Sequence, residues 1–598
     1  MSEKKNDTSA LPAPVAAASA QPPAPVKRST RFARAMGYLL VGYVVFLAGR
    51  GIWHEVSAGV GHAAPAVAGG CVQPEALLPS FDVSTVWGAK ERIVEVRALT
   101  RRFQWHQAAI RIPTESWDDM GAPGTDPRWD VFAQYHAYLE KSYPLVHKHL
   151  VKTTIDTWGL VYEWVGSDAG KRPLFITGHQ DVVPVLPDTV YQWEQPPYSG
   201  AYDGTWIWGR GASDDKSTTT AVLAAIELLL ESGEFAPSRT VVLAFGHDEE
   251  RGGLRGAKGI RDYLLNKYGR QPFALLVDEG SGLSAAWDRT FGLPGVAEKG
   301  KFDLNLTVST LGGHSSVPPP HTGIGLSALL IAQLEKNPYA PTLGPQAPVY
   351  GYLQCAAAHA PGIPAKLKRT VVAAASGCKK AARALPELII ATGLGGPGRA
   401  GAGQGSAERA LISTTQAVDI INGGVKVNAL PELVTTIVNH RLDISSSIAE
   451  LKGKIWDTLV PTAAELGLAV EGFGRSYAPE HARGTVYLES SRFSEDLEPA
   501  PISDTSDSSL AWAVFAGTAR GLWASRKEVS DGKAMVPLAA EDELIMAPFM
   551  TTGNTDTARY WDLARDIYRW RYVLNTEHQG GHTINERIGA DALVEFTR

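Results

Sequence analysis

The sequence has 598 residues, of which 44% are hydrophobic and 20% are charged, so it is long enough for two or three globular cores. The formal net charge of −6, with Lys and Arg scattered along the chain, argues against a nucleic-acid-binding protein. Three cysteines, Cys71, Cys355 and Cys378, are too few for a disulfide framework and have no CxxC spacing. In an oxidising compartment Cys355–Cys378 is the only pair that we consider, and isolated buried thiols are the alternative.

The N-terminal region divides into a polar tail and an apolar run. Residues 1–34 are rich in Ala, Pro and Ser and predict a disordered cytosolic tail. Residues 35–53 predict a transmembrane signal anchor, because the run from Ala35 to Gly49 carries no charge and Arg34 and Arg50 can snorkel. The basic residues concentrated before the run place the N-terminus in the cytosol. A cleaved signal peptide is the main alternative, but the basic region begins late for one.

Short apolar runs and helical patterns alternate along residues 74–297. The runs Pro173–Gly178, Thr240–Gly246 and Phe273–Gly280 predict buried strands, and Ser217–Gly233 predicts a helix. This alternation is typical of an α/β sandwich with a mixed, largely parallel sheet. In such sheets the polar groups at the carboxyl ends of the strands form the site.

The pattern changes over residues 298–475. Lys301–Thr310 alternates as a half-solvated strand does, and Glu432–Ile444 alternates in the same way. They predict an inserted α+β domain with an antiparallel sheet, after which residues 476–598 complete the α/β domain. The Gly-rich segment Gly393–Ala410 predicts a mobile loop. Asn305 lies in an NLT sequon, which is compatible with lumenal glycosylation.

Acidic and imidazole side chains follow the predicted strands. His179 and Asp181 come after the first strand, where an imidazole can bind zinc and a carboxylate can hold its other ring nitrogen. Asp214 and Asp215 precede the predicted helix. Taken singly, the histidine can be structural and the two acids can be a helix N-cap.

Three further groups of acidic or imidazole side chains follow downstream. Asp248, Glu249 and Glu250 follow a buried strand, and a cation would relieve their mutual repulsion. Asp278 ends the next strand, and His582 lies in a Gly-flanked loop. Two histidines with three carboxylates favour zinc over Mg²⁺ or Ca²⁺, which prefer oxygen ligands alone.

The combined motifs identify a resemblance over about Pro74 to the C-terminus. GHQDVVPV, GRGASDDKS, FGHDEERGG, LLVDEG, GGHSSVPP and GGHTINERI resemble the aminoacylase and carboxypeptidase family of di-zinc metallopeptidases. Within it the sequence is most similar to the Gly-Xaa carboxypeptidase branch of fungal vacuoles and to secreted animal N-acyl-amino-acid amidohydrolases. The resemblance also identifies the inserted domain as a lid, often called the dimerisation domain. The long Ala/Gly-rich segment of this lid, about Cys355 to Ala410, departs from the family pattern.

The resemblance implies roles for the motif residues. His179 and Asp278 are expected to hold one zinc, Glu250 and His582 the other, and Asp214 to bridge the two. Asp181 is expected to orient His179, and Glu249 to act as the general base. A cis peptide is expected after Asp214.

The resemblance also assigns residues of the lid and of a late loop. His314 matches the histidine that stabilises the tetrahedral intermediate, in some members across a dimer interface. Asn428 and Arg441 match residues that bind the substrate's terminal carboxylate, for which the planar guanidinium is suited. Gly553 and Asn554 match a substrate loop. The resemblance is therefore compatible with a homodimer.

The expected reaction is hydrolysis of the amide bond before a C-terminal amino acid, by a water activated between two Zn²⁺ ions. The substrate would be a small peptide, or alternatively an N-acyl amino acid carrying a fatty-acyl or acetyl group. An aminopeptidase would need a group that binds the substrate amine instead of Arg441. A non-catalytic binding domain is disfavoured by the complete set of ligands and base. The anchor and the resemblance together predict a type II membrane protein with its body in the vacuolar or secretory lumen.

Overall fold

The structure is a computed structural model that describes residues 70–79, 96–233, 235–395, 406–492, 495–525, 527–530, 534–537 and 543–597. The predicted tail (1–34) and signal anchor (35–53) lie outside these residues. Among the described residues, no helix is both long and apolar enough to cross a membrane.

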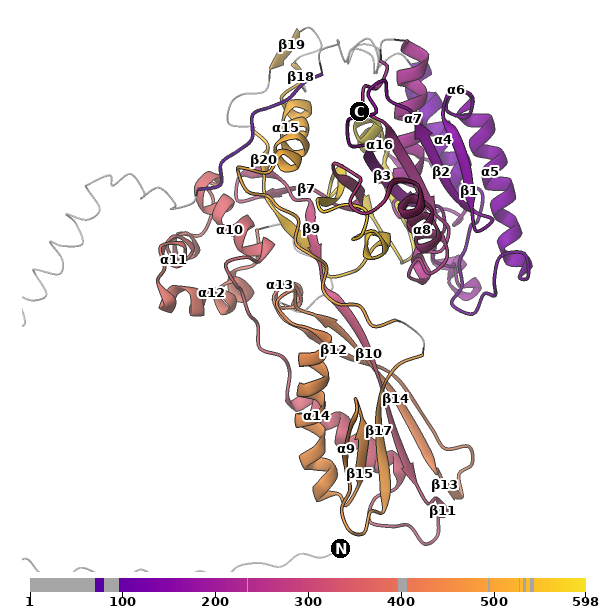
Figure 1. The fold of residues 1–598 in the computed structure, drawn as a ribbon, viewed down its shortest axis with the longest axis vertical. Helices are drawn as coiled ribbons and strands as arrows, with labels where there is room; N and C mark the ends of the chain where they lie inside the picture. The colour runs from indigo at the N-terminus through magenta and orange to yellow at the C-terminus, as the bar shows by residue number, and fades with distance from the viewer. Residues whose placement is uncertain are drawn as a thin grey trace, which may run out of the picture. The chain divides into compact units, whose positions relative to one another are not determined.

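The catalytic domain is built on a mixed sheet that has ten strands in the described part of the chain (Figure 1). Its strand order is β1-β2-β6-β3-β7-β22-β9-β21, with β8 pairing β7 and β20. The central neighbours β6, β3, β7 and β22 run parallel, as predicted. The strands are β1 (Val151–Ile155), β2 (Gly159–Trp164), β3 (Leu174–His179), β6 (Val241–Gly246), β7 (Leu276–Ala286), β8 (Arg289–Gly292), β9 (Gly295–Glu298), β20 (Ile545–Met546), β21 (Phe549–Thr551) and β22 (Ile567–Leu574).

Helices cover both faces of this sheet. Successive strand residues point to opposite faces, so the apolar residues of a strand can pack against helices on both sides. On β6, Leu243 and Phe245 pack with α7, while Val242 and Ala244 pack with α8. This arrangement confirms the predicted α/β sandwich. The helices of the domain are α4 (Val96–Ile110), α5 (Val131–Ser142), α6 (Pro144–His149), α7 (Lys216–Ser232), α8 (Gly256–Tyr268), α15 (Leu510–Ala524) and α16 (Ala590–Thr597), with the short η1 (Pro127–Asp130), η2 (Pro187–Gln192), η3 (Glu249–Arg251) and η5 (Asp556–Arg559).

The lid domain is a second sheet, six-stranded in the described residues, in the order β12-β14-β10-β17-β15-β16. All its pairs are antiparallel except β15–β17. Alternate residues of β14 are buried, and α9 and α14 pack against this side (Figure 1). The elements are β10 (Gly300–Thr310), β12 (Thr415–Gly423), β14 (Leu433–Leu442), β15 (Ala469–Gly472), β16 (Arg475–Tyr477), β17 (Gly484–Ser490), α9 (Gly323–Lys336) and α14 (Ile448–Glu465).

The lid differs from the predicted residues 298–475 in two ways. β17 belongs to its sheet, so the lid extends to Ser490. Four helices inside the predicted range pack instead against β8, β20 and β21 of the catalytic domain, because their apolar faces meet Phe291, Ile545 and Phe549. They are α10 (Pro348–His359), α11 (Ala365–Ala375), α12 (Lys379–Thr392) and α13 (Ser406–Leu411). Of the predicted Gly-rich loop, residues 396–405 lie outside the described part.

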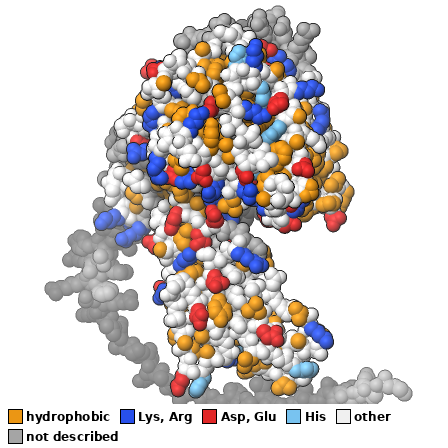
Figure 2. Space-filling model, turned by 45° about the vertical axis from the view of Figure 1, so that its right-hand side comes forward, with side chains coloured by type: hydrophobic (Ala, Val, Ile, Leu, Met, Phe, Trp, Pro, Cys, Tyr) orange, Lys and Arg blue, Asp and Glu red, His pale blue; other side chains and the backbone are white. Residues whose placement is uncertain are grey.

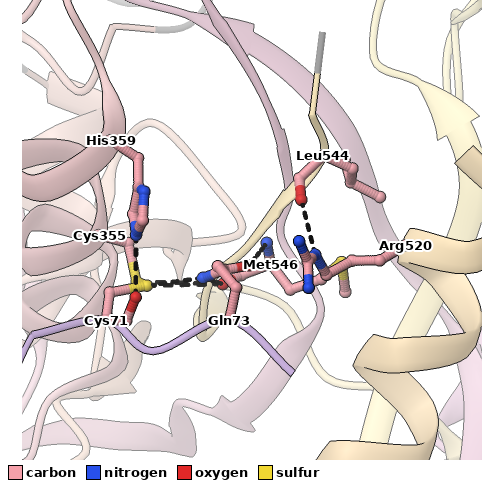
Figure 3. Close-up of a disulfide and its surroundings, with 7 residues drawn as sticks. All are labelled: Cys71, Gln73, Cys355, His359, Arg520, Leu544 and Met546. Carbon is pink, nitrogen blue, oxygen red and sulfur yellow. Dashed lines mark hydrogen bonds between the residues drawn. A yellow bond between two sulfur atoms is a disulfide. The ribbon is translucent and has the colours of Figure 1, made fainter. Parts of the chain in front are cut away.

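The disulfide joins Cys71 to Cys355 on α10, so neither alternative considered from the sequence, the pair Cys355–Cys378 or isolated thiols, describes Cys355 (Figure 3). Cys378 is exposed and free. The segment around Cys71 is also held by hydrogen bonds: the Gln73 amide pairs with the backbone of Met546, and His359 contacts the Cys71 carbonyl (Figure 3). No local pattern indicates this pairing, since the partners are 284 residues apart in the sequence.

Three small sheets complete the described fold. One, in the order β23-β24-β5-β4, brings the C-terminal segment against the turn that precedes α7. A second pairs β11 with β13 beyond the far end of the lid sheet (Figure 1). Their strands are β4 (Ala201–Tyr202), β5 (Trp206–Trp208), β23 (His578–Gln579), β24 (Arg587–Gly589), β11 (Gly313–His314), β13 (Ala429–Leu430) and a hairpin of β18 (Lys527–Ser530) and β19 (Ala534–Pro537).

Candidate metal centre and substrate-binding residues

Two imidazoles and several carboxylates meet where the parallel strands end. His179 is the last residue of β3, Glu249 and Glu250 lie in the turn that follows β6, and β7 supplies Glu279. The loop before α7 adds Asp214, with the expected cis peptide to Asp215 confirmed. His582 comes from the loop between β23 and β24.

Asp214 lies between the two imidazoles and presents one carboxylate oxygen to each. Its Oδ1 is 3.3 Å from His179 Nε2, and its Oδ2 is 3.3 Å from His582 Nε2. Glu279 Oε1 lies 3.2 Å from His179 Nε2, and Glu250 Oε2 lies 3.0 Å from His582 Nε2. The cluster therefore has two halves that share Asp214.

These separations suit metal ligands. Tetrahedral ligands about 2.0–2.1 Å from a zinc ion lie roughly 3.3 Å from one another. The four distances above, from 3.0 to 3.3 Å, match that spacing. Glu250 Oε1 is also buried without a hydrogen-bond partner, which a cation would supply. The donor set thus fits two metal ions, one at each imidazole.

The carboxylate beside His179 is Glu279 and not Asp278, which corrects the expected ligand set. Successive residues of a strand point to opposite faces, so only one of this pair can reach the imidazole. Asp278 Oδ1 instead accepts a hydrogen bond of 2.9 Å from the Glu279 amide, and its Oδ2 has no partner. The sequence does contain the signal for this ligand, which is the adjacent pair Asp278–Glu279. The first residue of the pair was expected to be the ligand, and the structure places the second one there.

Glu249 lies just outside this set. Its Oε2 is 3.9 Å from His179 Nε2, longer than the ligand spacing, so it can remain free of a metal. Burial raises the pKa of Glu249 well above its usual value, and the charges of Glu250 and Glu279 add to this effect. The geometry therefore leaves one carboxylate available to exchange a proton.

Asp181 organises the turn that carries both glutamates. Its Oδ1 lies 3.3 Å from His179 Nδ1, as expected for a residue that orients the imidazole. The same carboxylate accepts hydrogen bonds of 3.1 Å from the amides of Glu249 and Glu250 and one of 2.7 Å from Ser116. Asp248, the third acid of the motif, has a separate role, because it accepts the Arg255 and Gly256 amides at the start of α8.

The cluster needs positive charge. Burial opposes the charged form of His179, yet Glu279, Asp181 and Asp214 outweigh it and raise its pKa well above the usual value. Hydrogen bonds to Asp214 and Glu250 raise the pKa of His582 to about 10. Protons on the imidazoles balance the carboxylates here, and metal cations would meet the same need.

Arg441 and Asn554 contact each other directly. Arg441, near the end of β14, donates a hydrogen bond of 2.6 Å from Nη1 to Asn554 Oδ1. Asn554 Nδ2 donates to the carbonyl oxygen of Lys299 at 2.6 Å. Gly553 is the exposed residue beside this contact, and its carbonyl accepts from Thr551. Two of the predicted substrate residues are thus brought together, with Lys299 as an additional basic neighbour.

His314 and Asn428 lie elsewhere. Both are exposed, and they are neighbours across β11 and β13, where Ser315 donates to the Asn428 carbonyl. The register pairs Arg441 with Lys301 at one end of β10, while His314 follows the other end. Nine residues of strand at about 3.3 Å each separate these ends by roughly 30 Å. One chain therefore does not bring His314 and Asn428 to the same small ligand as Arg441.

Residues 175–598 match the model of peptidase family M20/M25/M40. Carboxypeptidase S of Saccharomyces cerevisiae is 38% identical over 467 residues, which cover 77% of this chain and 76% of the relative. The N-fatty-acyl-amino acid synthase/hydrolase PM20D1 of Mus musculus is 29% identical, with 85% and 86% covered.

Solved structures share the fold at low identity. Human carnosine dipeptidase 1 has a TM-score of 0.54 at 13% identity and covers 87% of this chain and 97% of its own. The metallo-carboxypeptidase Sso-CP2 of Sulfolobus solfataricus has a TM-score of 0.52 at 18% identity, with 84% and 97% covered. These similarities support the two-domain architecture described above.

Proposed function

The chain belongs to peptidase family M20/M25/M40, and we propose that it is a di-zinc metallocarboxypeptidase that removes the C-terminal amino acid from small peptides. The observation that carries the proposal is the position of Asp214, which presents one oxygen to each imidazole at ligand spacing. The similarity to carboxypeptidase S supports the same activity.

In this proposal His179, Glu279 and Asp214 would hold one zinc, and His582, Glu250 and Asp214 the other. Bound zinc lowers the pKa of a water molecule and polarises an amide carbonyl. Glu249 accepts the proton of the attacking water and passes it to the nitrogen of the leaving amino acid.

A buried lysine and a half-buried arginine favour a substrate with a free carboxylate. Lys299 donates to the carbonyls of Ala410 and Ser413, and Arg441 donates to Asn554. Within the described residues neither cation lies in an ion pair, and burial lowers the pKa of both. A buried charge is costly without a counter-ion, and a substrate carboxylate would supply one.

An apolar cavity beside these cations suits the side chain of the C-terminal residue. Its volume is about 290 Å³. Leu411 and Ile412 line the cavity, and in the sequence they lie between Ala410 and Ser413, whose carbonyls bind Lys299. Asp443, two residues after Arg441 in the sequence, also lines it. The other apolar lining residues are Leu343, Pro345, Ala347, Val349, Ile444, Ile502 and Met550. We therefore expect a preference for large apolar C-terminal residues.

The second candidate is an N-acyl-amino-acid amidohydrolase. The same cluster, cations and cavity serve a fatty-acyl amino acid, because it presents the same amide and the same carboxylate. The similarity to the N-fatty-acyl-amino acid synthase/hydrolase PM20D1 favours this alternative.

We propose that two copies form the working enzyme. His314 lies in an exposed tip that also carries the exposed apolar residues Leu311, Val425 and Val427. Exposed apolar clusters of this kind are typical of interaction sites. Because one chain holds its own His314 far from Arg441, a partner's tip would supply the histidine that stabilises the oxyanion.

Mixing two inactive variants tests the dimer. Glu249→Gln lacks the base, and His314→Ala lacks the tip histidine. In a mixed dimer one site combines an intact Glu249 with an intact His314 of the partner, so activity returns to about a quarter of wild type after random exchange. A mixture that stays inactive after verified exchange contradicts the shared site.

We also propose that the body lies in a vacuolar or secretory lumen. The disulfide between Cys71 and Cys355 supports this, because disulfides persist in oxidising compartments. The N-terminal anchor belongs to the same proposal. Protease treatment of sealed vesicles tests it: the body should resist digestion until detergent is added, and digestion without detergent overturns the topology.

Three substrates compared in parallel test the reaction: an N-acyl-Gly-Leu, its C-terminal amide and a fatty-acyl-Leu. Chelator-sensitive release of leucine from the free dipeptide, with the amide cleaved far more slowly, is the expected result. Preference for the fatty-acyl substrate moves the assignment to the amidohydrolase. Equal cleavage of acid and amide contradicts carboxylate recognition.

A further inference from the structure

Glu586 is a buried carboxylate that the proposed reaction does not use. It is inaccessible to solvent and lies four residues after His582, at the end of the same loop. Its carboxylate faces the turn that carries Asp214 and not the two imidazoles. The residue therefore touches the segments of two proposed metal ligands at once.

Four N–H groups fill the acceptor positions of this carboxylate. Oε1 accepts the amides of Ser213 at 2.8 Å and Asp214 at 2.9 Å. Oε2 accepts the Gly211 amide at 3.1 Å and the Arg210 guanidinium at 2.6 Å. With both oxygens occupied in this way, Glu586 has no lone pair directed at a metal.

The ion pair with Arg210 offsets the free-energy cost of burying the Glu586 carboxylate. Arg210 is itself buried, and its guanidinium lies 5.5 Å from the centre of the Trp193 ring. A buried carboxylate is stable when it is paired and fully hydrogen-bonded. Glu586 consequently adds little net charge to the neighbouring cluster, and its contribution is geometric.

The loop itself is shaped to hold Glu586 in place. Gly580 has φ +77°, and a Cβ there would lie 2.8 Å from the Glu586 Cα. The Glu586 carbonyl also accepts the Gly209 amide at 2.9 Å, and β24 then pairs with β5. The turn before α7 and the His582 loop are thus joined by side chain and backbone together.

We propose that Glu586 is a positioning residue that fixes the distance between Asp214 and His582. Asp214 and His582 would bind one metal together with Glu250. We therefore expect the metal at His582 to depend on Glu586 more than the metal at His179 does. The inference rests on the proposed metal centre, but it concerns metal binding and is measured without substrate. Residues that hold metal ligands in place typically change metal affinity by about 10- to 100-fold when replaced.

Zinc binding to Glu586→Gln tests the proposal. Gln keeps the size of the side chain but places an NH₂ group against N–H donors. At buffered zinc, the variant should keep one tight site and bind the second zinc about 10- to 100-fold more weakly than wild type. The Co²⁺-loaded protein should correspondingly lose the absorption bands that appear with the second equivalent.

Two further variants keep the test decisive. Glu577→Gln, in the same C-terminal hairpin, is the matched control and should bind both metals as wild type does. Glu586→Asp keeps the charge but is one methylene shorter, and it replaces Glu586→Gln if that variant does not fold. Equal affinity of wild type and variant for both zinc ions overturns the proposal, as does equal weakening of both sites. Wild-type protein that binds no zinc would instead refute the metal centre itself.

Discussion

Arg441 of the lid donates a hydrogen bond of 2.6 Å to Asn554 of the catalytic domain. Asn554 also donates to the carbonyl of Lys299, which lies between β9 and β10. The three residues therefore join the connection into the lid, strand β14 and a catalytic-domain loop. A substrate carboxylate bound here would contact both domains, so substrate binding and lid position are expected to be linked.

Arg441→Ala should raise KM for a free-carboxylate substrate and lower kcat/KM about 10- to 100-fold, because a charge-assisted hydrogen bond contributes about 1.5–3 kcal/mol. The amidated substrate should lose little further activity. Steady-state kinetics on the acid and the amide measure this. Arg475→Ala on β16 is the control, since Arg475 is exposed. Similar losses on both substrates would refute carboxylate binding by Arg441.

Glu249→Gln should lower kcat at least about 100-fold while two zinc ions stay bound, because general acid–base catalysis contributes about 10²–10⁴-fold. Glu250→Gln, the neighbouring replacement, should instead lose one zinc, since Glu250 lies at ligand distance from His582. Metal analysis and kinetics on the same samples separate the two. Near wild-type turnover by Glu249→Gln would end its assignment as the base.

Glu279→Gln and Asp278→Asn distinguish the two acids of β7. We expect Glu279→Gln to weaken the zinc at His179, because Glu279 lies 3.2 Å from that imidazole. Asp278→Asn should keep both zinc ions. The comparison is made by zinc titration of metal-free protein. Loss of zinc from Asp278→Asn alone would restore the assignment made from sequence.

The buried His106 should make the folded state less stable as pH falls from about 6.5 to 4. Burial lowers the pKa of His106 to about 4, while Thr220 and the Ala212 carbonyl bond its ring nitrogens. Between these pH values the unfolded chain binds a proton that the folded chain does not, so unfolding becomes easier by up to about 3 kcal/mol. Urea unfolding of metal-free wild type and His106→Gln at pH 7.5 and 4.5 should show a smaller pH effect in the variant. An identical effect in both contradicts the contribution of His106.

Cys71→Ser should destabilise the body by about 2–5 kcal/mol, because the disulfide to Cys355 closes a long loop. Cys378→Ser is the control and should leave the unfolding midpoint unchanged, since that thiol is exposed and free. Reductant should lower the midpoint of wild type and of Cys378→Ser but not that of Cys71→Ser. A midpoint of wild type that does not respond to reductant would contradict a stabilising disulfide.

The sequence predicted the elements with strong periodicity and the ligands that follow them. β3, β6, α7, β10 and β14 lie within a residue or two of their predicted bounds, since each has a regular apolar pattern and a polar or glycine boundary. The choice between Asp278 and Glu279 depended on which face of β7 meets His179, and a tandem pair does not encode that orientation.

Other features depended on contacts distant in sequence. The partner of Cys355 was set by the packing of α10 against the catalytic sheet, which no local pattern indicates. Glu586 was passed over for the same reason, because its role lies in amides more than 370 residues earlier. The separation of His314 from Arg441 became visible only from the register of β10 with β14.

The most direct measurement of the central claim is a titration of metal-free protein with zinc, in which bound metal and leucine release from N-acyl-Gly-Leu are followed together. Two zinc ions should bind per chain, and hydrolysis should rise with the second equivalent and disappear again with chelator. Full activity without metal, or two bound zinc ions without any release of leucine, would contradict a di-zinc carboxypeptidase.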